Sequence, residues 1–217
     1  MGYFIHTAEG HDFPQKDLEA IGKAQIITIE KWEECNLNCT NRVGSGCGHT
    51  DEKIIRQCKL IKSVDPSTVC LMYHDTNTVW DCLSGNCSGR GTDNIQYAYA
   101  KTANENPEKY LLYCSEDDPH CTPGELKRSG YVNATIIDFR KPAGAALWIN
   151  ACVDATKSGY VDGCFVDFCG WGLSNSSYPG YSAAHNKAMK DLTAAIGPHG
   201  VTMGNNCGPG RVPGVCH

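Results

Sequence analysis

Two kinds of segment are missing from this 217-residue sequence: a run of apolar residues long enough to cross a bilayer, and a run of lysines or arginines. A membrane-spanning helix needs about 20 predominantly apolar residues in a row, and a nucleic-acid or anionic-membrane partner is usually met by a basic patch. The net charge is −5 and the isoelectric point is about 5.9. We therefore expect neither nucleic acid nor a membrane surface as a partner.

The motifs of several common enzyme classes are also missing. No Gly-x-Gly-x-x-Gly fingerprint follows an apolar run and no Walker lysine motif is present, so nucleotide-binding versions of an α/β fold lose their main support. There is no Gly-x-Ser-x-Gly elbow for a serine hydrolase and no His-x-x-x-His pair for a zinc protease. These absences predict a site that works without a cofactor and without a metal ion.

Cysteine, by contrast, is abundant, with 14 in the chain. An even and high number of cysteines is typical of proteins in an oxidising compartment, where they form disulfides. Four sequons, starting at Asn38, Asn86, Asn133 and Asn175, agree with passage through a secretory route. We expect a secreted glycoprotein that is reinforced by disulfides.

Short β-rich runs alternate with amphipathic helical patterns along the sequence. Strands are expected at residues 2–6, 25–30, 69–75, 134–139, 161–167 and 200–207, with helices that begin near Pro14, Thr50, Pro142 and Ser182. Such alternation predicts a parallel sheet, either in a barrel or in a doubly wound fold, and the missing nucleotide motifs favour the barrel. Because a complete barrel usually takes about 250 residues, we expect a single α/β domain over 1–217, a TIM-like (β/α) barrel that is incomplete or degenerate.

The region from about residue 76 to 131 interrupts this alternation. It is rich in Gly, Asn, Asp and Ser, and its one apolar piece is YLLYC at 110–114. A loop this long inside a compact domain is usually functional or is evidence of a misread element. We interpret the region as an insertion stapled by Cys82, Cys87, Cys114 and Cys121, and YLLYC as a fourth strand.

Residues 134–170 predict where the site lies. Two expected strands end in aspartates, Asp138 and Asp167, and a helix that starts at Pro142 and ends before Gly159 joins them. Because functional groups of βα folds gather at the carboxyl ends of strands, we expect both carboxylates side by side at that rim. The alternative is structural: Asp138 braces the turn before Pro142, and Asp167 accepts hydrogen bonds from loop amides.

Acidic, aromatic and amide side chains recur at the other strand ends. Glycosidic hydrolysis needs one carboxylic acid to protonate the leaving oxygen and one carboxylate to act as nucleophile or to activate water, while aromatic faces hold the sugar. The pattern predicts a glycosidase with three candidate catalytic residues, Asp167, Asp138 and Glu30. The candidate substrate-binding residues are Trp32, Tyr73, His74, Asp75, Arg140, Trp171, Asn205 and Asn206. Glu30 has an alternative role in an ion pair with Lys31 or Arg140, and Trp148, on a helix, is assigned to the core.

These segments also resemble a known family. The segments IITIEKW, LMYHD, the IIDFRKP to DGCFVDF unit and TMGNN are similar to TIM-barrel glycoside hydrolases in which an aspartate-proline strand turn precedes an Asp-Gly-x-Phe-x-Asp strand. The resemblance covers the βα framework but not the cysteine-rich insertion. It implies a carbohydrate substrate and a catalytic or substrate-holding role for Asp167, and also for Asp138.

Two other functions stay open at this stage. The final strands of a full barrel are not recognisable, which is also compatible with a carbohydrate-binding or defence protein that keeps the barrel and its aromatic rim without turnover. A weaker alternative is a barrel phosphodiesterase with His6 and His74 as acid and base.

Overall fold

The core of the protein is a parallel sheet whose strands follow one another in chain order. The computed structural model describes residues 2–5, 12–30, 50–80, 98–129, 134–167, 173 and 175–205. The strands of the sheet are β1 Gly2–Ile5, β2 Ile26–Ile29, β3 Val69–Asp75, β6 Gly163–Asp167 and β7 Val201–Gly204. They lie in the order β1-β2-β3-β6-β7 and all neighbours are parallel. The reversal of strand order that marks a doubly wound sheet is absent from these five strands.

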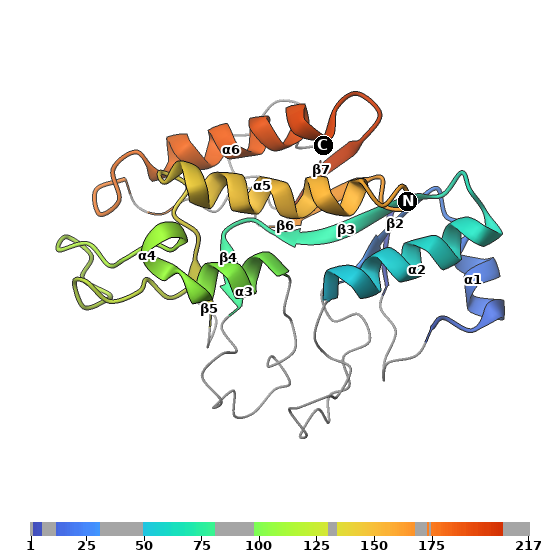
Figure 1. The fold of residues 1–217 in the computed structure, drawn as a ribbon, viewed down its shortest axis with the longest axis horizontal. Helices are drawn as coiled ribbons and strands as arrows, with labels where there is room; N and C mark the ends of the chain where they lie inside the picture. The colour runs from blue at the N-terminus through green and yellow to red at the C-terminus, as the bar shows by residue number, and fades with distance from the viewer. Residues whose placement is uncertain are drawn as a thin grey trace, which may run out of the picture.

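Helices cover one face of this sheet (Figure 1). They are α1 Gln15–Ile21, α2 Thr50–Val64, α5 Pro142–Thr156 and α6 Tyr181–Ile196. Strand residues such as Ile27, Met72 and Val166 pack with helix residues in the main core, whereas Leu71 and Phe165 belong to a separate cluster made of strand residues alone. A one-sided helix layer over strands in chain order is the construction of a (β/α) barrel wall. The described residues form an open wall of this kind, which fits an incomplete barrel.

Helix α5 shows how the sequence directs this packing. Pro142 occupies the first helical position, where its missing N–H costs nothing, and Trp148, Cys152 and Ala155 are buried on the face toward the sheet. Gly144 allows a close approach, because a Cβ there would lie 2.7 Å from the backbone oxygen of Asp138. The predicted core position of Trp148 is confirmed.

Three disulfides lie within the described residues. Cys58–Cys70 joins α2 to β3, and Cys152–Cys164 joins α5 to β6, each with a sequence separation of 12. Both therefore link a helix to the strand that follows it. Cys114–Cys121 closes a small loop in the insertion. Cys82 and Cys87 lie outside the described residues.

The prediction that the strands at 134–139 and 161–167 are neighbours in one sheet is wrong. Strand β5, Ala134–Ile136, pairs antiparallel with β4, Thr78–Trp80, in a separate two-stranded sheet. The place beside β6 is taken by β3, from Leu71 to Asp75. The physical reason is that the chain folds back directly after β3, so that β4 satisfies the backbone hydrogen-bonding groups of β5.

The predicted strand at 110–114 is also wrong. Pro107 starts a short helix, α4 Pro107–Tyr110, which takes the first residue of that segment. Leu111 and Tyr113 then form single antiparallel bridges with Ile137 and Leu126 instead of joining the main sheet. Together with α3, Ala98–Glu105, these pieces gather beside β4 and β5 at one end of the molecule (Figure 1). None of the helices in the described ranges is both long and apolar enough to span a membrane.

Candidate active site

Two carboxylates meet at the carboxyl ends of β3 and β6. Asp75 and Asp167 are register partners on adjacent strands, which lie about 4.8 Å apart in a sheet. Tyr73 lies on the same face of β3 as Asp75, two residues earlier. Its hydroxyl donates a hydrogen bond to Oδ2 of Asp167 at 2.7 Å and lies 3.3 Å from Oδ1 of Asp75. One phenol therefore joins the two acids, with the shorter contact to Asp167.

The carboxylate of Asp167 is held on both of its oxygens. Asn205, after β7, donates from Nδ2 to Oδ1 at 2.8 Å, opposite the bond from Tyr73. The backbone oxygen of Asp167 accepts hydrogen bonds from the amide of Thr76, at 3.2 Å, and from its hydroxyl. Asp167 is half-buried and Asp75 is 3% exposed. The arrangement fixes the orientation of Asp167 while leaving part of it accessible.

Negative charge surrounds the Tyr73 hydroxyl. Burial raises the pKa of Tyr73 far above its ordinary value, and the charges of Asp75, Asp167 and Glu30 raise this pKa further. Tyr73 thus keeps its proton at neutral pH and acts as a donor. Glu30 follows β2, and its amide donates to the oxygen of Ile5 at 2.9 Å. Glu30, Tyr73, Asp75, Asp167 and Asn205 form what we call the acid cluster.

Asp138 has a different environment. The guanidinium of Arg140 donates hydrogen bonds to both oxygens of Asp138, from Nε to Oδ1 at 2.9 Å and from a terminal nitrogen to Oδ2 at 3.0 Å. The backbone amide of Arg140 also donates to Oδ1. Asp138 is 4% exposed, and its hydrogen bonds raise the pKa of the Arg140 guanidinium. Because β5 belongs to the small antiparallel sheet, the structure does not bring Asp138 and Arg140 into the acid cluster. Their geometry fits the structural alternative, in which Asp138 braces the turn before Pro142.

His74 lies on the opposite face of β3 from Tyr73. Its ring is fully buried, stacks on Trp148 with centroids 4.7 Å apart, and has Nε2 within 3.1 Å of the Trp148 backbone oxygen. Burial lowers the pKa of His74 to about 4. A neutral imidazole in the helix-side core does not reach a ligand at the rim, so the phosphodiesterase alternative loses one of its two histidines. Trp32, Trp171, Asn206 and His6 lie outside the described residues.

A second buried histidine, His185 on α6, packs against Phe139 with ring centroids 5.2 Å apart. It is 2% exposed, and within the described part of the protein its Nε2 has no hydrogen-bond partner. Burial lowers its pKa to about 4, as for His74. Two core histidines of this kind link the stability of the fold to pH.

We expect the protein to lose stability as the pH falls from about 6.5 to about 4. In this window the unfolded chain protonates His74 and His185 while the folded protein does not, so each proton favours unfolding. The expected loss at pH 5 relative to pH 7.5 is roughly 2 kcal/mol per histidine. Urea unfolding at the two pH values measures it. His185→Leu should show about half of the loss, and equal unfolding midpoints for the unmodified protein at both pH values would contradict the assignment.

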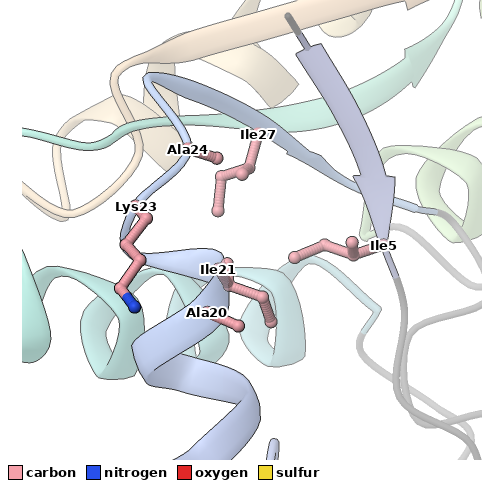
Figure 2. A pocket seen from close by; sticks show the side chains of 6 residues that line it. All are labelled: Ile5, Ala20, Ile21, Lys23, Ala24 and Ile27. Carbon is pink, nitrogen blue, oxygen red and sulfur yellow. The ribbon is translucent and has the colours of Figure 1, made fainter.

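Two hollows lined by described residues lie elsewhere. One, of about 270 Å³, opens between α1 and the first two strands and is lined by Ile5, Ala20, Ile21, Lys23, Ala24 and Ile27 (Figure 2). The other, of about 290 Å³, lies between α2, α3 and α5, beside Asp51 and Asp154. Both are on the helix-covered side of the sheet. The acid cluster faces the other side, so neither hollow belongs to the candidate active site.

The pairing of Asp75 with Asp167 escaped the sequence reasoning, which grouped Asp75 with substrate-binding residues. A signal for it exists: Tyr73-x-Asp75 and Phe165-x-Asp167 end their strands with the same aromatic-x-Asp spacing. Equal spacing places both acids at the same height when the strands align in register. Thr76, which holds the backbone of Asp167, was missed because only its contact reveals its role.

Comparison with known proteins identifies the fold but no family. No family model and no curated protein matches the sequence. Among solved structures, the glycoside hydrolase domain of PelA from Pseudomonas aeruginosa matches with a TM-score of 0.57 at 12% identity, over 99% of this chain and 64% of that one. An α-galactosidase from Thermus thermophilus matches with a TM-score of 0.53 at 11% identity, over 94% and 37%. A GH36 α-galactosidase from Geobacillus stearothermophilus gives 0.51 at 12%, over 99% and 29%.

This chain therefore spans less than two thirds of the length of each of these chains. The likeness shows a fold of the glycoside hydrolase barrel type.

Proposed function

We propose that this protein is a secreted glycoside hydrolase acting on an oligo- or polysaccharide, with Asp167 and Asp75 as its carboxylate pair. The observation that carries the proposal is the Tyr73 hydroxyl, which lies within hydrogen-bond reach of both acids at the carboxyl ends of adjacent strands. The glycoside hydrolase fold of the structural neighbours supports a carbohydrate substrate. The disulfides support an oxidising, extracellular location.

The two acids differ in ways that suit different tasks. Asp167 is partly exposed and both of its oxygens are oriented by donors, from Tyr73 and Asn205, as befits a nucleophile that must attack along one direction. Asp75 is the more deeply buried of the two, the setting in which glycosidases place their general acid. Glu30, across Tyr73, is the third candidate. Asp138, ion-paired to Arg140, is not part of this machinery.

The spacing of the acids predicts the stereochemistry of the reaction. Oδ2 of Asp167 and Oδ1 of Asp75 are 2.7 Å and 3.3 Å from one hydroxyl, so these two oxygens lie no more than about 6 Å apart. Retaining glycosidases hold their carboxyl groups about 5 to 5.5 Å apart, whereas inverting enzymes leave about 6.5 to 9.5 Å for a water molecule. We therefore expect retention of the anomeric configuration.

The test is hydrolysis of a panel of polysaccharides and oligosaccharides, with reducing ends measured first and the first-formed anomer then identified by NMR. Release of reducing ends with the anomer of the substrate retained is the expected result. Inversion would show that Asp75 and Asp167 are not the reacting pair. Absence of both cleavage and binding across the panel would contradict the glycosidase proposal itself.

A carbohydrate-binding protein without turnover is the second candidate. The observation in its favour is the open sheet of five parallel strands within the described residues, since barrel glycosidases place catalytic groups on several strands around a closed ring. Isothermal titration with the same panel separates the two: binding without release of reducing ends supports this candidate.

A further inference from the structure

The insertion is tied to the segment before α6 through one buried carboxylate, Asp118. Its Oδ2 accepts hydrogen bonds from Nζ of Lys127 at 2.6 Å and from the hydroxyl of Tyr178 at 2.6 Å, and Oδ1 accepts the His120 amide at 2.9 Å. These donors hold the pKa of Asp118 well below its usual range, so the carboxylate stays ionised at neutral pH. We call Asp118, Lys127 and Tyr178 the clasp.

The contacts of the clasp are shielded from solvent and reinforced on both sides. Asp118 is 6% and Tyr178 is 2% exposed. The Cys114–Cys121 disulfide closes the loop that carries Asp118, and the hydroxyl of Ser177 donates to the backbone oxygen of Asp117 at 3.1 Å. Removing one member of a buried, hydrogen-bonded charge pair leaves the other uncompensated. Loss of one member of the clasp should therefore weaken the contact between segments about 60 residues apart in sequence.

The two linked segments follow the two acids of the proposed pair along the chain. The insertion starts directly after Asp75, and the connection that leads to residues 175–180 starts directly after Asp167. In Figure 1 the loop after α4 and the start of α6 lie at the same end of the molecule. Loops that follow the carboxyl ends of barrel strands surround the substrate in (β/α) enzymes. The clasp thus joins the insertion, which follows Asp75 in the chain, to residues 177–178, which come between Asp167 and α6.

We infer that Asp118 is a positioning residue that sets the shape of the substrate-binding rim. This inference rests on the proposed glycosidase function and adds to it a determinant of substrate affinity. By fixing residues 175–180 against the insertion, the clasp prearranges the wall that an oligosaccharide contacts beyond Asp75 and Asp167. Because Asp118 does not touch the reacting atoms, its loss should weaken binding and leave the chemical step nearly unchanged.

Tyr178→Phe tests this inference, because it removes one hydroxyl and keeps the buried ring. For a substrate that the unmodified protein cleaves, KM is expected to rise about tenfold, the factor that one charge-assisted hydrogen bond supports, with kcat changed by less than about twofold. Hydrogen exchange of the amides of residues 175–180 should become faster. Asp118→Asn, which also removes the charge, should act in the same direction and more strongly.

Tyr181→Phe is the matched control. It removes another buried tyrosine hydroxyl, one that donates to the Ile137 oxygen at 2.9 Å and takes no part in the clasp. Unchanged KM and exchange in Tyr178→Phe, or an equal rise of KM in the control, would overturn the inference while the glycosidase proposal stands. Should the unmodified protein neither cleave nor bind any glycan, the proposed function fails, and the inference fails with it.

Discussion

Replacing Asp167 with asparagine is expected to lower kcat by at least about 10³-fold, equivalent to about 4 kcal/mol of transition-state stabilisation. The amide has the size of the carboxylate and can still accept from Tyr73 or Asn205, but it cannot form the covalent glycosyl intermediate or carry the negative charge that stabilises an oxocarbenium-like transition state. KM should change little, because the loss falls on the chemical step.

The measurement is the initial rate of reducing-end release on the best substrate of the panel, with far-UV circular dichroism to confirm that the variant is folded. Asp154→Asn is the control. Asp154 is an exposed aspartate on α5 that pairs with Lys157 at 2.7 Å, and its replacement should leave the rate unchanged. Full activity of folded Asp167→Asn would remove Asp167 from the mechanism and shift attention to Asp75 and Glu30.

Gly163→Ala is expected to destabilise the fold by at least about 4 kcal/mol, enough to unfold a protein of ordinary stability. A Cβ at residue 163 would lie 1.8 Å from the backbone oxygen of Val201 and 2.7 Å from its carbonyl carbon. These atoms belong to β7, which pairs with β6 at this point, so the clash can be relieved only by separating the two strands. The φ of +157° adds strain for any residue with a side chain.

Urea unfolding, or the yield of soluble protein where the variant does not fold, measures this effect. Gly159→Ala provides the comparison, because Gly159 has a φ of +77° but a Cβ added there would meet no described atom within 4 Å. Gly159→Ala should lower the free energy of unfolding by about 1 to 2 kcal/mol, from the strain of the left-handed backbone conformation alone. A Gly163→Ala protein as stable as Gly159→Ala would mean that β6 and β7 are not packed as the structure describes.

The part of the fold that local patterns determine was predictable from sequence. Val69–Asp75 carries its hydrophobic run and its terminal acid together, and Pro142 and Gly159 mark where α5 begins and where the chain turns after it, so these elements lie as expected. The pairing of the strands was harder to predict. Strand β5 pairs with Thr78–Trp80, which lies in a segment whose sequence is typical of a loop. A three-residue strand has too few positions to show a period.

The same limit applies to the candidate site. Asp167 was singled out from its place at a strand end, and the structure gives it ordered partners in Tyr73 and Asn205. Its pairing with Asp75 depends on which strands are neighbours, and this is decided by contacts between distant segments. Asp138 looked equivalent in sequence because a carboxylate that braces a turn and one that faces a substrate both follow an apolar run.

The residues of the Asp-Gly-x-Phe-x-Asp strand differ in what they contact. Asp162 accepts a hydrogen bond from the Cys70 amide at 2.8 Å and pairs with Lys62 at 2.8 Å, and Gly163 admits the backbone of Val201. These two residues fasten β6 to β3 and β7. Phe165 packs against Tyr73 with ring centroids 6.3 Å apart, and Asp167 belongs to the acid cluster. A match at the first two positions of the motif therefore indicates how the strands pack and gives no indication of a catalytic role.

The two crosslinks with equal spacing, Cys58–Cys70 and Cys152–Cys164, bear on how the chain matures. Each closes a loop of 12 residues within one helix–strand unit, so its thiols meet through local encounters and need no completed sheet. Closing a loop of this size stabilises the folded protein by about 3 kcal/mol, because it lowers the conformational entropy of the unfolded chain. Each of these disulfides can thus form within its own helix–strand unit before the strands assemble into the barrel wall.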